Sequence, residues 1–558
     1  MQILLNNIKR NLKIFFDKIK SFEINTNICI FTLIYSLFTT IAFNINFFRS
    51  VYEIDKSVIS VVIAFIIILC IYNVLFTLIF QRKITKFFAI FFLFGNAGVL
   101  YFMNTYNVAI DKVMLLNVRE TNLNETLELL NTIWFSYLII LGLLPSIIVL
   151  KTKINYKKIS KDFLYKGLSI LISFIIVIST VLITYKGLSS TVRQNKRLKH
   201  ILVPFNYIDA SFGLFKKSFK QKKYQFENIT EDVVYNSHTT NNKKNLVIFV
   251  VGEASRSKNW SLSNYERNTN EYLEKEDLIY YNNFFSCGTS TAISVPCMFS
   301  NLSRNDFDIE KRDAHSNLLD FLKKADFNIL WRENNSDCKG VCVRHNEDDF
   351  TKDKSNKKYC NDKECFDEIL VDDLQEKIDN LNAQDNFIVL HQKGSHGPAY
   401  YLRYPKEFEK YKPTCNSEYF NKCENEEIVN SYDNTINYTS YVLDKAIEIL
   451  KSNEDKYNVA LIYVSDHGQS LGEKGIYLHG APYRFSPKEQ RHIPFFMWFS
   501  NDFKKEFNID EKCLKDKSTQ EYSHDNIFHS VLGLFNIKTK YYDKDLDIFY
   551  NCKSNISK

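Results

Sequence analysis

The chain has 558 residues, of which 45% are hydrophobic and 24% are charged, and its formal net charge is +7. A mean hydropathy of −0.22 excludes a chain that lies entirely within a membrane. The basic residues are mixed with acids and no nucleic-acid motif is present, so the charge predicts no nucleic-acid partner. The apolar residues form long uncharged runs before residue 187 and short runs after residue 245, which predicts a membrane part followed by a soluble part.

Five uncharged runs in the first part are long enough to cross a membrane, because a helix needs about 20 apolar residues to span the hydrocarbon core. Gly95, Asn96 and Gly98 interrupt the third run. The first run is too long for the apolar segment of a signal peptide, and four more runs follow it, so we interpret it as a membrane helix. The predicted spans are 28–48, 57–81, 87–110, 129–150 and 167–185.

Lysine and arginine gather on one side of these spans. They are concentrated before the first span, at 82–86 and at 151–166, whereas the other two connections lack this excess. The positive-inside rule therefore predicts a cytoplasmic N-terminus. Five crossings then place everything after residue 187 on the outer side of the membrane.

The segment 193–223 mixes nine lysines and arginines with aromatic and aliphatic residues. Two interpretations remain open: an amphipathic stretch on the membrane surface, or a solvated linker. We predict a transmembrane domain at 1–186, an amphipathic membrane-surface linker at 187–244 and a soluble domain at 245–558 outside the membrane.

Ten of the twelve cysteines follow residue 280, whereas Cys29 and Cys70 lie in apolar runs and are predicted to be unreactive. An even number of cysteines in close pairs predicts disulfides, which persist in the periplasm. The spacings do not match those of structural zinc ribbons. The predicted pairs are Cys287 with Cys297, Cys338 with Cys342, Cys360 with Cys365, Cys415 with Cys423 and, with the weakest pattern, Cys513 with Cys552.

Short apolar runs alternate with helical patterns in the soluble part. Helices are expected near 316–324 and 426–451. This alternation predicts an α/β domain with a largely parallel central sheet and helices on both faces. The expected strands are 245–251, 327–331, 387–391, 459–464 and 494–499.

Polar residues follow several of these strands directly. Glu253 follows the first strand, and Asp466 with His467 follows the strand at 459–464; His396 and His479 lie in nearby loops. The carboxyl ends of parallel strands meet at one edge of a sheet, so we expect these side chains to converge. Carboxylates and imidazoles together predict a zinc site. Taken singly, each residue has an ordinary alternative as a cap, a turn or a loop residue.

Small residues precede an apolar stretch between 286 and 297, which predicts a helix that begins near Thr291. A hydroxyl at a helix N-terminus meets unsatisfied N–H groups and the positive end of the dipole, which favours an alkoxide and a bound phosphate. Thr291 is therefore a candidate nucleophile. The alternative is that Thr289 or Thr291 is only a helix N-cap.

Five motifs together resemble the phosphoethanolamine transferases that modify lipid A, a membrane-anchored branch of the alkaline phosphatase and sulfatase superfamily. The resemblance implies an alkaline phosphatase-like sandwich behind five transmembrane helices. The motifs are VGEASR at 251–256, SCGTSTAISVPCMFS at 286–300, GSHGP at 394–398, SDHGQSLGE at 465–473 and YLHGAP at 477–482.

The resemblance also implies residue roles. Thr291 would be the nucleophile, and Glu253, Thr291, Asp466 and His467 would hold one zinc ion. His396 and His479 would contact the substrate phosphate, assist proton transfer or bind a second zinc. The disulfide Cys287–Cys297 would clamp the nucleophile helix. The residues expected to face the ethanolamine head are Asn117, Thr121 and Glu125.

The reaction that the resemblance implies starts from phosphatidylethanolamine and passes through a modified threonine to lipid A or a related acceptor. Added amines would lower the surface's negative charge and its attraction for cationic peptides such as polymyxin. The enzyme is expected to be a monomer. Alternatives are a phosphoglycerol transferase on the same fold, or a non-catalytic envelope-binding protein. A sulfatase is disfavoured, because Cys287 lacks the C/S-x-P-x-R context.

Overall fold

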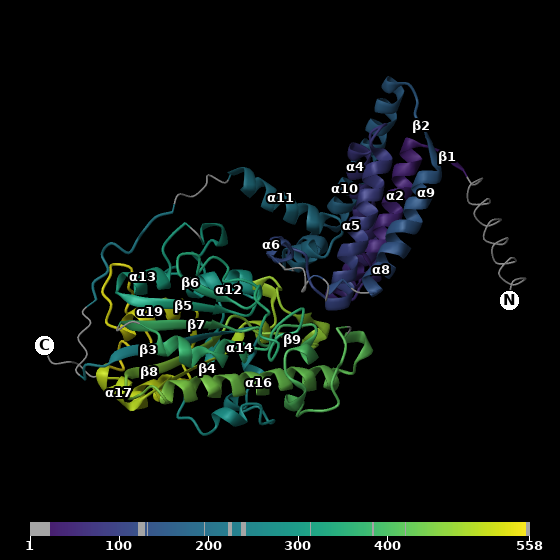
Figure 1. The fold of residues 1–558 in the computed structure, drawn as a ribbon. Helices are drawn as coiled ribbons and strands as arrows, with labels where there is room; N and C mark the ends of the chain where they lie inside the picture. The colour runs from purple at the N-terminus through teal and green to yellow at the C-terminus, as the bar shows by residue number, and fades with distance from the viewer. Residues whose placement is uncertain are drawn as a thin grey trace, which may run out of the picture. The chain divides into compact units, whose positions relative to one another are not determined.

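The chain divides into two compact units, Met1–Lys112 with Leu130–Phe215, and Val113–Leu129 with Lys216–Lys558 (Figure 1). Each unit is described by itself. The computed structural model describes residues 23–120, 126, 129–130, 132–194, 196–220, 226–235, 241–312, 314–381, 384–418 and 420–553.

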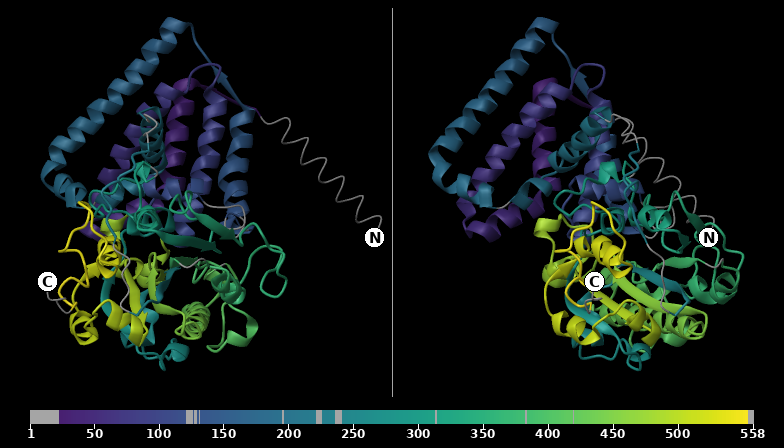
Figure 2. Two further views of the ribbon diagram at one scale, coloured as in Figure 1. Left: turned by 60° about the vertical axis from the view of Figure 1, so that its left-hand side comes forward. Right: turned by 90° about the vertical axis from the view of Figure 1, so that its left-hand side faces the viewer.

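The first unit is a bundle of apolar helices, seen from two sides in Figure 2. Within the described residues, four helical segments are long and apolar enough to cross a membrane, or five if the bent pair α2 and α3 is one span. Helix α4 packs against both α2 and α10. The helices are α2 (Ile28–Phe43), α3 (Ile45–Asp55), α4 (Val58–Ile79), α5 (Thr85–Tyr106), α8 (Thr132–Tyr137) continued by a π segment (Leu138–Leu143) and α9 (Leu144–Lys151), α10 (Ile159–Gln194) and α11 (Phe205–Lys220).

The first predicted span is not one straight helix, since α2 and α3 meet at an angle of 63°. Asn44 lies at the bend and its side chain is buried. Its Nδ2 donates to the Thr39 carbonyl at 3.1 Å and to the Val203 carbonyl at 3.0 Å, and its Oδ1 accepts from the Val203 N–H at 2.9 Å. A side-chain amide that binds backbone groups of another segment interrupts the helical ladder and accounts for the bend.

The third span continues unbroken through the Gly95–Gly98 interruption as part of α5. The side-chain oxygen of its polar residue has a partner inside the unit, because Asn96 Oδ1 accepts from the Tyr207 hydroxyl at 2.8 Å. On the outside of the bundle, large apolar side chains such as Phe163 are exposed. Such a surface, on helices of this length, is suited to lipid.

The second unit is built on an eight-stranded sheet in the order β12-β4-β11-β8-β3-β7-β5-β6. Only β11 runs antiparallel to its neighbours in this sheet. The prediction of an α/β domain with a largely parallel sheet is confirmed, but β4 and the short strands β6 and β12 were not predicted. The strands are β3 (Lys244–Gly252), β4 (Ile279–Phe285), β5 (Phe327–Glu333), β6 (Asn346–Asp349), β7 (Asp385–His391), β8 (Tyr457–Ser465), β11 (His492–Phe499) and β12 (Tyr522–Ser523).

Helices cover both faces of this sheet (Figure 1). In β3, Val247, Phe249 and Val251 belong to one core, and the alternating residues Leu246 and Ile248 belong to the other. Because successive side chains of a strand point to opposite faces, a strand buried on both sides is apolar throughout. The helices are α12 (Thr291–Met298), α13 (Leu318–Lys324), α17 (Asn501–Glu506), α18 (Glu511–Lys517) and α19 (Asp525–Leu534) on the first core, and α14 (Ile369–Asp372), α15 (Leu374–Asp379) and α16 (Asn425–Lys451) on the second.

Five disulfides cross-link this unit, and Cys29 and Cys70 remain free thiols in the other unit. Four of the bridges join close neighbours, and the fifth closes a longer loop near the C-terminus. Short-range disulfides of this kind stabilise the loops around the sheet, because they restrict the conformations of these segments in the unfolded chain. The bridges are Cys287–Cys297, Cys338–Cys342, Cys360–Cys365, Cys415–Cys423 and Cys513–Cys552.

Candidate active site

The candidate active site lies where β3 and β8 end side by side. These strands are parallel neighbours, and Gly252 pairs with Ser465 in the last register position. The next residues, Glu253 and Asp466, therefore leave the sheet together, and both side chains are fully buried. Because the carboxyl ends of neighbouring parallel strands lie at one edge of the sheet (the strand-end rule), two carboxylates 213 residues apart in the chain lie side by side.

The backbone at this point is held in a conformation that few non-glycine residues adopt. Ala254 has a φ of +52°. Its N–H donates to Asp466 Oδ1 at 3.1 Å, and the same oxygen accepts the N–H of His467 at 2.6 Å. Left-handed backbone at a non-glycine residue costs about 1–2 kcal/mol, so these hydrogen bonds keep the Glu253 loop and the Asp466 loop locked together.

Gly394 is needed for the same reason. Its φ is +48°, and a Cβ atom at this position would lie 2.7 Å from the Glu253 carbonyl oxygen. Its N–H donates to the buried Asp367 Oδ2 at 2.8 Å. The GSHGP motif can therefore approach the Glu253 backbone only because its first residue has no side chain.

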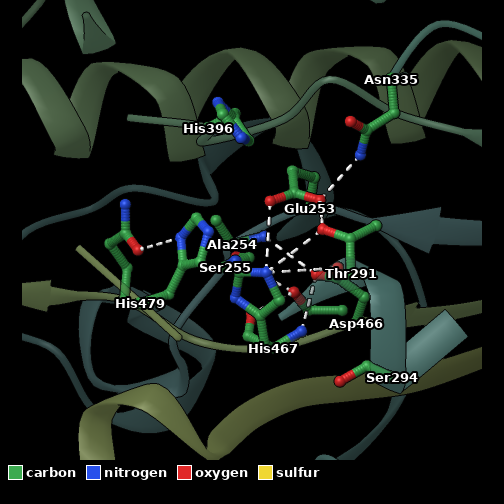
Figure 3. A network of polar contacts seen from close by, with 12 residues as sticks. Glu253, Ala254, Ser255, Thr291, Ser294, Asn335, His396, Asp466, His467 and His479 are labelled. Carbon is green, nitrogen blue, oxygen red and sulfur yellow. Dashed lines mark hydrogen bonds and ion pairs between the residues drawn. The ribbon is translucent and has the colours of Figure 1, made fainter. Parts of the chain in front are cut away.

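Thr291 is the first residue of α12, and Ser290 occupies the N-cap position. The Thr291 hydroxyl does not cap the helix: it donates to Glu253 Oε2 at 2.9 Å and lies 3.4 Å from His467 Nε2. Figure 3 shows these three side chains pointing toward one another. The Thr289 hydroxyl is engaged elsewhere, since it donates to the Ala481 carbonyl at 2.7 Å.

His467 presents one defined nitrogen to this cluster. Its Nδ1 donates to the Gly468 carbonyl at 2.8 Å, so the lone pair is on Nε2. That nitrogen lies 3.4 Å from both Glu253 Oε1 and Asp466 Oδ2. Glu253 Oε1 and Asp466 Oδ2 are buried atoms that have no hydrogen-bond donor among the described residues.

The electrostatics of the cluster are unfavourable without a cation. Burial and the nearby Asp466 carboxylate raise the pKa of Glu253 to about 8. Burial raises the pKa of Asp466 to about 6 and lowers the pKa of His467. Zinc in proteins binds carboxylate oxygens and imidazole nitrogens. This cluster offers two carboxylate oxygens that accept no hydrogen bond, an imidazole lone pair and a hydroxyl, so its residues fit a zinc ion.

His396 and His479 lie beside this cluster, as Figure 3 shows. The His479 ring is 4.3 Å from the His467 ring and 5.7 Å from the His396 ring, centroid to centroid. Gln469 Oε1 accepts from His479 Nδ1 at 2.9 Å. Ligand atoms of Glu253, His467 and His479 come within 4.8 Å of one another, so His479 is near enough to share a ligand with the cluster.

Of the three residues predicted to face the ethanolamine head, only Asn117 lies in the described part of the chain. It belongs to α6 (Lys112–Glu120). A Cβ atom added at Gly480 would lie 3.1 Å from Asn117 Nδ2, so Asn117 is next to the residue that follows His479. Thr121 and Glu125 lie outside the described residues.

Three residues at the ends of β5 and β7 were missed by the sequence analysis. Asn335 Nδ2 donates to Glu253 Oε2 at 2.7 Å and lies 3.3 Å from His391 Nε2. His391 Nδ1 in turn donates to Glu333 Oε2 at 2.7 Å, and both of these side chains are fully buried. The chain Glu333–His391–Asn335 fixes the orientation of Glu253. The strand-end rule that selected Glu253 applies equally to these residues and was the available signal.

Comparisons with known proteins agree with this geometry. The family model described as "Phosphoethanolamine transferase EptA/EptB" matches residues 68–219, and the Sulfatase model matches residues 245–537. The phosphoethanolamine transferase EptA of Escherichia coli K12 is 38% identical over 540 residues, which cover 94% of this chain and 97% of that protein. The phosphatidylethanolamine transferase Mcr-1 of E. coli is 36% identical and covers 82% of this chain and 84% of its own.

A solved structure matches over almost the whole length. It is the integral membrane lipooligosaccharide phosphoethanolamine transferase A (EptA) of Neisseria meningitidis, with a TM-score of 0.91 and 34% identity over 95% of this chain and all of that one. The apolar helices and this match make the present chain a multi-pass membrane protein. The chain therefore belongs to the EptA family of phosphoethanolamine transferases, membrane enzymes with a sulfatase-type catalytic domain of the alkaline phosphatase superfamily.

Proposed function

We propose that the enzyme transfers phosphoethanolamine from phosphatidylethanolamine to lipid A or a closely related envelope glycan, and that Thr291 carries the group between them. The observation that supports this most directly is the Thr291 hydroxyl, 2.9 Å from a buried carboxylate and 3.4 Å from an imidazole nitrogen. The lipooligosaccharide in the name of the Neisseria relative supports an acceptor of the lipid A class.

In the first step, Thr291 Oγ1 attacks the phosphorus of the donor. A bond forms between Oγ1 and phosphorus, the bond from phosphorus to the glycerol oxygen breaks, and diacylglycerol leaves with the proton that the threonine hydroxyl releases. In the second step, a phosphate oxygen of the acceptor bonds to the same phosphorus, the bond from phosphorus to Thr291 Oγ1 breaks, and Oγ1 takes up the proton released by the acceptor phosphate, which restores the hydroxyl. A covalent intermediate divides one difficult transfer into two easier ones.

Glu253, Asp466, His467 and the Thr291 hydroxyl are the residues that would hold a zinc ion in this site. When bound, zinc lowers the pKa of a coordinated hydroxyl and stabilises negative charge on phosphate oxygens. Asn335 holds Glu253 in place by donating to Oε2, the oxygen that also accepts from Thr291. His396 and His479 line the neighbouring space, where they would contact the donor phosphate or hold a second ion, and Asn117 is near enough to meet the ethanolamine head.

The proposed arrangement in the cell follows the sequence interpretation: a transmembrane domain at 1–186, a surface linker at 187–244 and a catalytic domain at 245–558 outside the inner membrane. Five disulfides in the catalytic unit support this side, because disulfides persist in the periplasm and are rare in a reducing cytosol. A cytoplasmic N-terminus and a monomeric state belong to the same proposal.

The test is to incubate the purified full-length protein with phosphatidylethanolamine alone and to measure the mass of the peptide that contains Thr291. A gain of one phosphoethanolamine, lost again when lipid A is added, is the expected result. A gain of glycerol phosphate from phosphatidylglycerol would favour the phosphoglycerol transferase instead. A protein that never gains mass with either donor would overturn the threonine intermediate.

A further inference from the structure

Two arginine side chains lie over one tyrosine ring that is bonded to the segment before α12, the helix that begins at Thr291. The guanidinium carbon of Arg304 is 3.4 Å from the centroid of the Tyr483 ring, and that of Arg491 is 5.1 Å from the same centroid. Arg304 follows α12, and Arg491 directly precedes β11. Tertiary structure thus gathers two permanent positive charges that are far apart in the sequence.

Neither guanidinium forms an ion pair within the described part of the chain, although Arg304 interacts electrostatically with the Asp525 carboxylate. The Nε atoms of Arg304 and Arg491 are buried and lack a hydrogen-bond partner there. Asp525 is the acid beside Arg304, but its Oδ1 accepts from the Arg304 backbone N–H at 2.8 Å. The only described partner of the Arg304 guanidinium is Asn305 Oδ1, at 3.2 Å from Nη1. Two neighbouring positive charges whose N–H groups lack acceptors favour the binding of an anion between or beside them.

The arginine pair is tied directly to the nucleophile loop. The Tyr483 hydroxyl donates to the Ser286 carbonyl at 2.9 Å, and the Ser286 N–H donates to the Arg491 carbonyl at 2.8 Å. The Thr289 hydroxyl binds the Ala481 carbonyl, two residues before Tyr483. Because Thr289 precedes Thr291 by two residues, this link is within about 7 Å of Thr291 along the chain. The pair is therefore tied to the segment that leads into the nucleophile helix, and it is not part of the ligand cluster around Glu253.

We propose that Arg304 and Arg491 form a binding site for a second phosphate group of the acceptor, one that is not itself modified. This inference rests on the proposed function, in which the acceptor is a phosphorylated glycolipid. Guanidinium groups bind phosphate oxygens through paired, charge-assisted hydrogen bonds, and the Tyr483 ring holds the two groups in position. Such a site selects acceptors with two phosphates over acceptors with one and orients the phosphate that receives phosphoethanolamine.

The experiment uses the full-length enzyme in detergent, with phosphatidylethanolamine as donor and either bisphosphorylated or monophosphorylated lipid A as acceptor. In Arg304→Gln and in Arg491→Gln, the KM for the bisphosphorylated acceptor should rise about tenfold or more, the loss expected for a hydrogen bond to a charged group. The KM for the monophosphorylated acceptor and for the donor should change little. The matched control is Arg484→Gln, an exposed arginine next to Tyr483.

Several outcomes of this experiment would overturn the inference. An equal rise for both acceptors, or a fall in melting temperature that matches the loss of transfer, would make the arginines a structural brace. A higher donor KM with slower modification of Thr291 would make them a phospholipid headgroup site. If a glutamine variant does not fold, the lysine variant at the same position keeps the charge but not the paired hydrogen bonds, and it must still raise the acceptor KM. Wild-type protein that never modifies Thr291 would instead refute the proposed function.

Discussion

Two sets of carboxylates in the catalytic unit have opposite surroundings. Asp320, at the start of α13, accepts two bonds from the Arg344 guanidinium, at 2.8 and 2.6 Å. Although burial raises it, the contacts with His345 and Arg344 lower the pKa of Asp320 to about 2. Glu253 and Asp466 face no lysine or arginine among the described residues, and burial raises the pKa values of these two groups instead.

The difference separates a structural acid from a functional one. A buried carboxylate with a fitted cation stabilises the fold, whereas two buried carboxylates without one are costly until a ligand supplies the positive charge. Buried groups whose pKa values are pushed toward neutrality by desolvation are typical of functional sites. Substitutions at the Glu253–Asp466 site should therefore impair transfer and zinc binding, whereas a substitution at Asp320 should affect only stability.

The largest effect should come from Thr291→Ala, which removes the proposed nucleophile. Transfer to lipid A should fall by at least about a thousandfold, since loss of a nucleophile removes the whole covalent route. Chromatography and mass spectrometry of the lipid product measure this. Thr289→Ser keeps a hydroxyl that can reach the Ala481 carbonyl and should retain most of the activity. Full transfer by Thr291→Ala would exclude the assignment.

The second effect concerns the metal. Glu253→Gln and Asp466→Asn should each reduce bound zinc from about one ion per chain to a small fraction, because each removes an anionic ligand. Elemental analysis of the purified protein measures the zinc content. Asp320→Asn, which alters the paired carboxylate instead, should leave the zinc content unchanged. Wild-type zinc content in both site variants would show that the unpaired carboxylates do not bind the ion.

A smaller effect is expected from Asn335→Ala, which removes the hydrogen bond to Glu253 Oε2. Groups that orient a metal ligand typically contribute about 10–100-fold to metal affinity or activity. Competition with a chelator of known affinity measures the loss of zinc binding independently of turnover. Asn416→Ala, at an exposed position, is the control and should bind zinc as the wild type does. If both variants bind equally well, Asn335 does not position Glu253.

The smallest effect is on stability. Asp320→Asn should lower the free energy of unfolding by about 2 kcal/mol at neutral pH, the equivalent of its pKa shift. Because the folded pKa is lowered from 3.8 to about 2, this stabilisation is present above pH 3.8 and is lost as the pH falls toward 2. Thermal unfolding in detergent across this range should show the wild type and the variant converging. A constant difference down to the lowest pH would contradict the ionic origin.

The short-range pattern of apolar and polar residues was sufficient to predict most of the membrane segments and the core strands of this protein. The apolar runs predicted the second, third and fourth membrane segments within four residues, whereas the first is a bent pair of helices and α10 begins well before the predicted fifth span. Continuous apolar strands predicted the parallel core of the sheet. Glu253, Asp466 and His467 were found because a strand that ends in a polar residue marks the edge of the sheet. Asn335 and His391 also lie at strand ends, which was the local signal for them, but their bonds to Glu253 and to each other depend on the tertiary structure.

The sequence by itself determined the class of the fold, the order of the membrane segments and of five strands, and the strand-end positions of Glu253, Asp466 and His467, because these depend on periodicity over a few residues. Tertiary structure alone decided the bend at Asn44, the support of Glu253 by Asn335 and the stacking of Arg304 and Arg491 on Tyr483. The physical reason is that each of these depends on side-chain contacts between segments dozens to hundreds of residues apart. A local pattern carries no information about such contacts until the strands and loops are placed in space.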